Sequence, residues 1–220
     1  MELGLLPLAL AVLVFLVSHR LTNQPRFRRW AEARLGGIVG FSVAYSIVSL
    51  ALLAWIIVAY QQAPTLLLWE QAPWMRWVPP LAMLPACLLL TIGMTAANPF
   101  SIGPGRRGYD PARPGLLRLT RHPILWGLAL WAAAHMVPNG DVAALMIFAP
   151  LLALALMGLR LLDSKRKRSL PDWQQLAALT AKIHPAMLPE IGWWRPLAGL
   201  AIYALLLWLH EPVIGASPLP

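Results

Sequence analysis

The sequence has little charge and a single cysteine. Only 12% of its 220 residues are Asp, Glu, Lys or Arg, whereas 59% are hydrophobic. A soluble domain rarely carries so little charge, so this composition indicates a membrane protein. The lone Cys87 excludes an intramolecular disulfide, and we expect it to be a small packing residue within an apolar segment.

Motifs for several familiar chemistries are absent as well. The sequence contains no CxxCH for covalently attached haem and no HExxH for a zinc protease. Asp and Glu total nine residues, and the apolar segments hold almost none of them. Ionisable side chains inside transmembrane segments are costly and are usually functional. The five histidines are therefore the leading candidates for ligands or catalytic groups.

Six apolar runs predict the fold. Each contains no Asp or Glu and at most one Arg, and most approach the roughly 20 residues that cross a bilayer. We extend the first and fourth runs through their polar flanks, to residues 1–20 and 120–140. The sequence therefore predicts an all-α, polytopic helical bundle with about six transmembrane helices, forming one domain over residues 1–220. The runs are residues 3–17, 36–60, 77–97, 124–137, 142–162 and 193–209.

The basic residues are distributed unevenly along the chain, whose net charge is +9. Of the 18 Lys and Arg, all except Arg76 lie in residues 20–34, 106–121 and 160–182 or at Arg195. These are the first, third and fifth connections, which share one side of a six-helix chain. The positive-inside rule places them in the cytoplasm and both termini outside. We expect anionic lipid headgroups, and not nucleic acid, to be the partners of this basic face.

Two further segments carry local predictions. Gly36, Gly37, Gly40 and Ala44 give the second run a small-xxx-small pattern, which lets helix backbones approach closely in lipid. Packing within the chain is the favoured explanation, and a homo-oligomer interface is the alternative. Residues 172–182 have the pattern of a short interfacial helix.

The main candidate site lies in residues 119–141. Arg121, His122 and Pro123 precede an apolar segment that carries His135 and ends in a Pro-Asn-Gly-Asp turn. Proline is tolerated in a first helical turn, so we predict that a helix begins at Pro123. His135 then lies roughly 20 Å beyond His122 and points about 140° away from it. The two histidines therefore cannot bind one metal ion.

Two neutral imidazoles on separate helices of a bundle are a standard way to hold haem iron. His135 lies deepest in an apolar segment, whereas His19 and His122 lie at the ends of predicted helices. Sequence patterns alone leave the choice of ligands open.

The segments SHRLTNQPRFR (residues 18–28) and TRHPILWGLALWAAAHMVPNGD (residues 120–141) resemble the NnrU family. These are bacterial membrane proteins associated with nitrite and nitric oxide reduction, and they are related to the plastid 15-cis-zeta-carotene isomerase. The resemblance implies an inner-membrane location and a haem b held by His19 and His135. We expect Arg121 to pair with a haem propionate or a lipid phosphate. His19 with His122 is the alternative ligand pair, because the predicted topology places both on one side.

Three functions are compatible with the sequence. The first is a haem-dependent redox or isomerase enzyme acting on a small hydrophobic substrate. The second is a non-catalytic accessory or transport protein supporting denitrification. The third is a membrane methyltransferase, because RHPILWG is similar to the RHPxYxG elbow of the isoprenylcysteine carboxyl methyltransferases, with Leu125 at the tyrosine position.

Overall fold

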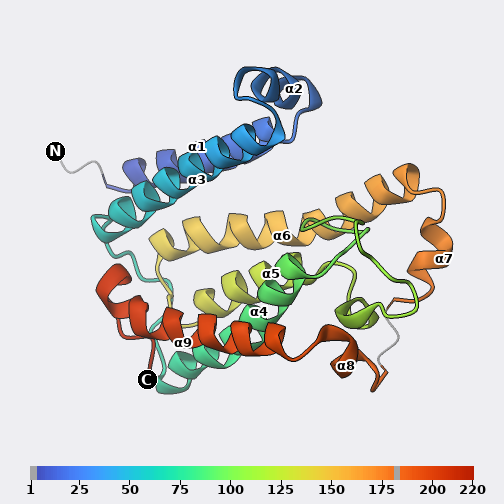
Figure 1. The fold of residues 1–220 in the computed structure, drawn as a ribbon. Helices are drawn as coiled ribbons and strands as arrows, with labels where there is room; N and C mark the ends of the chain where they lie inside the picture. Colours follow the sequence, from blue (N-terminus) through green and yellow to red (C-terminus); the bar gives the residue numbers. More distant parts are fainter. Residues whose placement is uncertain (1–3, 181–183) are drawn as a thin grey trace. The chain divides into compact units, whose positions relative to one another are not determined.

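The protein is all-α, as the sequence predicts (Figure 1). The computed structural model describes residues 4–180 and 184–220, and within these residues the extended structure is limited to one antiparallel bridge between Leu67 and Asp141. Two short 3-10 helices, η1 (Pro73–Trp77) and η2 (Gly115–Arg118), accompany the α-helices. The α-helices are α1 (Leu6–Thr22), α2 (Pro25–Arg34), α3 (Ile38–Gln61), α4 (Val78–Thr95), α5 (Pro123–Met136), α6 (Val142–Ser169), α7 (Trp173–Ala177), α8 (Met187–Ile191) and α9 (Trp194–Ile214).

Several helices have the length and composition of membrane spans. In the described residues, four segments qualify: α3, the η1–α4 segment, α6 and α9. Helices α1 and α2 meet at 85° and give a fifth span if they are counted as one bent unit, while α5 is a shorter apolar helix. The polytopic membrane architecture is therefore confirmed, whereas the count of six and the outward location of both termini stay predictions.

The chain folds into two compact units. The first unit contains Met1–Trp69 with Gly140–Ile147, and the second contains Glu70–Asn139 with Phe148–Pro220. In the first unit α1 packs against α3, and Leu8 and Ala11 of α1 are fully buried.

The glycines before α3 form a turn and not the helix face that the sequence suggested. Helix α3 begins only at Ile38, and Gly36 and Gly37 have φ angles of +77° and +94°. Glycine adopts these left-handed conformations without a steric penalty. A Cβ on Gly40 would lie 1.6 Å from the carbonyl oxygen of Leu35, so this glycine accommodates the end of the same turn.

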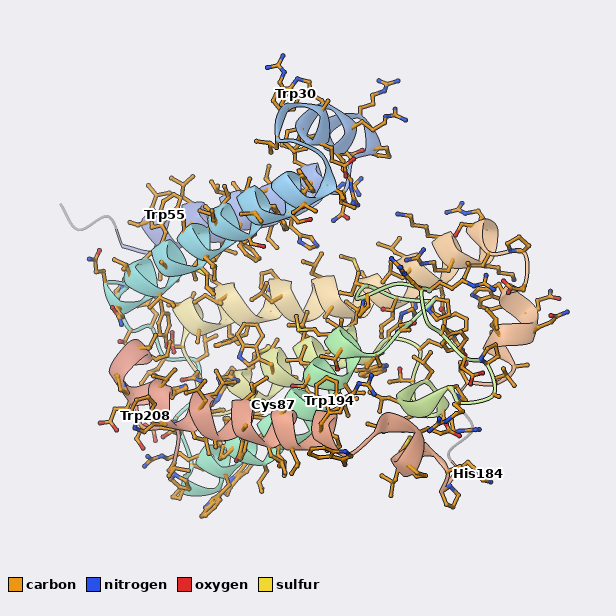
Figure 2. The ribbon with its side chains drawn as sticks, in the orientation of Figure 1. Trp30, Trp55, Cys87, His184, Trp194 and Trp208 are labelled. Atoms are coloured by element: carbon orange, nitrogen blue, oxygen red, sulfur yellow. The ribbon has the colours of Figure 1, made fainter. Side chains whose placement is uncertain are left out.

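The second unit is organised around α4, which packs against both α5 and α9. Glycines permit the close approach. A Cβ on Gly127 of α5 would lie 2.7 Å from Cγ of Leu90, and one on Gly199 of α9 would lie 2.9 Å from Cδ2 of Leu88. Cys87, labelled on α4 in Figure 2, is a free thiol that is 1% exposed, which confirms its expected packing role.

The predicted interfacial helix after α6 is shorter than expected. Helix α7 covers Trp173–Ala177, and residues 178–180 form turns and a bend. The remainder of the predicted segment, Ala181 and Lys182, lies outside the described residues. Leu176 of α7 is buried against Phe100 and Leu117, so this helix caps a small apolar cluster.

We predict that Gly127→Ala destabilises the protein by about 1–3 kcal/mol, because the added methyl group overlaps Leu90 and the backbone of α4. Unfolding by SDS in mixed micelles measures the change. Leu128→Ala is the matched control: Leu128 is the next residue of α5 and is exposed, so we expect about 0.5 kcal/mol or less. Equal effects of the two substitutions would show that α4 and α5 do not approach closely.

Candidate functional site

The elbow before α5 is built as predicted, with the helix beginning at Pro123 and His122 as its N-cap residue. Asn98 fixes the elbow from the loop after α4. Its Nδ2 donates to the carbonyl of Arg121 at 2.9 Å, and its Oδ1 accepts from the backbone N–H of Phe100 at 2.8 Å. Asn98 is 1% exposed, so its hydrogen bonds are formed away from water.

The carboxylate of Asp163, near the end of α6, binds both polar residues of the elbow. Arg121 donates through Nη2 at 2.7 Å and Nε at 3.2 Å, and His122 Nε2 lies 2.8 Å from Oδ1. Nη1 of Arg121 also donates to Oγ1 of Thr180 at 3.0 Å. We call Arg121, His122, Asp163 and Thr180 the Asp163 cluster. It joins α5, α6 and the segment after α7 through charge-assisted hydrogen bonds, which are stronger than neutral ones.

Burial controls the charge of His122, which is 4% exposed. Desolvation lowers the pKa of His122, and the hydrogen bond to Asp163 opposes this effect only in part. A neutral His122 donates its Nε2–H to the carboxylate, which can only accept. Its Nδ1 is then a buried acceptor, without a hydrogen-bond partner in the described part of the chain. The guanidinium of Arg121 lies 5.9 Å from the ring centroid of Trp173.

A second ion pair lies between η2 and α8. Nη2 and Nε of Arg118 donate to the carboxylate of Glu190 at 2.7 and 2.9 Å, and the N–H of Gly115 donates to it at 2.9 Å. The Glu190 side chain is only 9% exposed. The hydrogen bond from Arg118 lowers the pKa of Glu190 below its usual value, so Glu190 is ionised at neutral pH.

His135 lies in an aromatic group at the other end of α5. Its Nδ1 is 2.8 Å from the carbonyl oxygen of Trp131 and therefore donates to it. Its ring centroid lies 5.2 Å from that of Phe148 and 6.4 Å from that of His210. His210 of α9 repeats the pattern, because its Nδ1 lies 2.8 Å from the carbonyl of Ala216.

His19 belongs to the first unit, whereas Arg121, His122 and His135 belong to the second. Nδ1 of His19 lies 3.2 Å from the hydroxyl of Tyr45 on α3. The hydrogen bonds of His19, His135 and His210 thus all involve Nδ1 and a partner in the same unit, whereas that of His122 involves Nε2. The residues with described positions contain no group of three or more His, Cys, Asp or Glu side chains able to hold a metal ion.

The sequence identified the elbow but missed its partner. Asp163 is 42 residues after Arg121, so no local periodicity connects them. The available signal was its position, since Asp163 is the only acidic residue among the basic residues 160–168. No comparable sequence signal pointed to Thr180 or to His210, which lies beside His135. The contacts of both residues depend on how distant segments pack.

We predict that Asp163→Asn destabilises the protein by about 2 kcal/mol, because it removes the anion that Arg121 and the buried His122 share. Asp172→Asn is the matched control. Asp172 pairs with Arg106, whose side chain is 53% exposed against 26% for Arg121, so we expect a clearly smaller loss of stability than for Asp163→Asn. SDS unfolding compares the two variants, and an Asp163→Asn effect no larger than the control would contradict a structural role of the cluster.

Comparison with known proteins identifies the family. No curated protein and no solved structure matched the chain. The family model described as NnrU protein matches residues 7–218, which is nearly the whole chain. The match includes His19, the Arg121–Pro123 elbow and His135, the residues on which the sequence resemblance rested. The chain therefore belongs to the NnrU family of membrane proteins.

Proposed function

We propose that this NnrU-family membrane protein binds haem b, and that His135 and His19 would hold its iron. The proposal places it in the bacterial inner membrane with its basic loops in the cytoplasm. The bound haem would serve nitrite and nitric oxide reduction or a haem-dependent isomerisation of a small hydrophobic substrate. These are the activities that the sequence resemblance implies.

The ring nitrogen that His135 leaves available is the observation that carries the proposal. A backbone carbonyl can only accept, so the 2.8 Å contact with Trp131 fixes the proton of a neutral His135 on Nδ1. The lone pair is then on Nε2. Metal-binding histidines commonly donate their other N–H to a carbonyl or carboxylate, which fixes the tautomer and orients the ring. His135 meets this requirement within α5 itself.

The same criterion separates the other histidines. Nδ1 of His19 interacts with the hydroxyl of Tyr45, which leaves Nε2 for a ligand. His122, the alternative ligand in the sequence analysis, instead has Nε2 at 2.8 Å from Asp163 and is 4% exposed. The nitrogen that His122 keeps for a ligand is Nδ1, and that atom is buried. An iron could not reach Nδ1 without a rearrangement of the elbow, and ligation through Nε2 would break the hydrogen bond to Asp163, so the geometry favours His135.

The residues around His135 suit an apolar cofactor. Trp131 and Phe148 contact the ring, with centroid distances of 6.0 and 5.2 Å, and aromatic side chains of this kind pack well against a porphyrin. When bound, haem supplies a redox-active iron. The hydrogen bond to Trp131 holds the neutral imidazole in one tautomer. Arg121 is bound to Asp163 and Thr180 in this structure, so a propionate would have to share its guanidinium.

Two further proposals concern partners. Anionic lipid headgroups match the positive charge of the basic loops. We also propose that the protein can form a homo-oligomer. Of the four small residues predicted to form its interface, only Gly40 and Ala44 lie within α3.

An absorption spectrum of the purified protein in mild detergent, oxidised and reduced, tests the haem proposal. We predict a Soret band and reduced bands of the b type in the wild type. His135→Ala and His19→Ala should each abolish or strongly shift the Soret band, because each removes a residue that would hold the iron. His122→Ala is the control and should retain it.

His210→Ala separates a neighbour from a ligand. If His210 only packs beside His135, the variant retains the haem spectrum. A wild type that stays colourless after haem is added would overturn the proposal. Loss of the spectrum in His122→Ala, with retention in His135→Ala, would overturn the ligand assignment.

A further inference from the structure

A cavity of about 370 Å³ lies in the second unit, away from the histidines discussed above. Its walls come from the end of α4, the loop that leads into η2 with the start of η2 itself, and the stretch from the end of α8 to the start of α9. Ile92, Leu116 and Ile191 form a buried apolar cluster, and all three line the cavity. The cavity therefore has an apolar floor.

Polar groups that donate hydrogen bonds also line it. Tyr109, Arg113 and Arg195 all contribute to the walls. The hydroxyl of Tyr109 and Nε of Arg195 are buried, and neither has a hydrogen-bond partner in the residues that the structure describes. Buried polar groups in proteins are almost always satisfied, by protein, by ordered water or by a ligand. The Nε–H of an arginine is a donor only, so it requires an acceptor.

The carboxylates at the cavity already have partners. Glu190 accepts from Arg118 and from the N–H of Gly115, and Oδ1 of Asp110 accepts from the N–H of Ala112. Arg113 and Arg195 line the cavity together with Asp110 and Glu190, and Arg118, which is not part of the lining, pairs with Glu190. With Arg118 included, these charged groups carry one more positive than negative charge. An anion is favoured over a cation by this balance.

We propose that this cavity binds a phosphate group, with Arg113, Arg195 and Tyr109 as its donors. A phosphate presents several strong acceptor oxygens, which match the unpaired N–H and O–H groups. The phosphate can belong to the headgroup of an anionic phospholipid, whose apolar part would lie on the Ile92, Leu116 and Ile191 floor, or to a free phosphate ion. Such a site is stoichiometric, unlike a general attraction between basic loops and a membrane surface.

Two features of the site support a defined binding geometry. The guanidinium of Arg195 lies 4.9 Å from the ring centroid of Trp194, labelled at the start of α9 in Figure 2, and its Nη1 donates to the carbonyl of Ile191. These contacts hold the side chain in place before a ligand arrives. Burial raises the pKa of Tyr109, so its hydroxyl stays protonated at neutral pH and available as a donor.

Isothermal titration of the full-length protein in detergent tests the proposal with three probes at matched ionic strength. The probes are dihexanoylphosphatidylglycerol, dihexanoylglycerol without a phosphate, and inorganic phosphate. We expect phosphatidylglycerol or inorganic phosphate to bind with a stoichiometry of one, and the phosphate-free lipid to bind at least about ten-fold more weakly. Binding of phosphatidylglycerol alone assigns the site to a lipid headgroup, and tight binding of inorganic phosphate assigns it to free phosphate.

Point variants connect the binding to this cavity. Arg195→Gln and Arg113→Gln should each weaken binding by about ten-fold or more, since each removes a charge-assisted hydrogen bond. Arg168→Gln is the matched control, because Arg168 is an exposed arginine at the end of α6, and it should change affinity by less than about two-fold.

Tyr109→Phe is a variant that tests the site and is expected to fold normally. It deletes a hydroxyl without a partner in the described residues, so the fold should be preserved while affinity falls by about five-fold. Equal binding of the phosphate-free lipid, no binding of any phosphate probe, or equal losses in Arg195→Gln and Arg168→Gln would overturn the proposal. The haem spectrum is read separately on the same samples, so failure of one proposal does not imply failure of the other.

Discussion

The hydrogen bonds that the carboxylate of Asp163 accepts hold together the part of the second unit where α5 begins and α6 ends. One carboxylate accepts from Arg121 and from His122, consecutive residues at the start of α5. Burying a charge is unfavourable unless it is paired and hydrogen-bonded. Asp163 satisfies this condition for Arg121, and Arg121 does so for Asp163, which fixes the end of α6 against the start of α5.

The same interaction divides the histidines of this chain into two chemical types. His122 is held through Nε2 and is part of the structural network. His135, thirteen residues later on the same helix, is held through Nδ1 by a carbonyl of its own helix and keeps Nε2 for another partner. The helix therefore carries a structural histidine at one end and a candidate ligand at the other, in agreement with the divergent directions that helical geometry predicts.

Much of the fold was predictable from the sequence, because apolar runs and prolines act locally. The start of α5 at Pro123 and the packing role of Cys87 followed from residue type and position. The contact between Arg121 and Asp163 did not, because it joins segments far apart in the chain. The spacing of Gly36 and Gly37 predicts a helix face, because spacing is visible in a sequence, whereas the positive φ angles of these residues are not. The polar cavity near Arg195 had no sequence signal, because three separate segments form it.

Measuring the tautomers of His122 and His135 tests the assignment of a structural and a ligand histidine most directly. Nitrogen-15 NMR of the haem-free protein with labelled histidine distinguishes a protonated from an unprotonated ring nitrogen at each site, with His122→Ala and His135→Ala used for assignment. We predict that His122 carries its proton on Nε2, donated to Asp163, and that His135 carries its proton on Nδ1, donated to the carbonyl of Trp131. A His135 protonated on Nε2 would contradict the account, because its available nitrogen would then face its own helix and not a ligand.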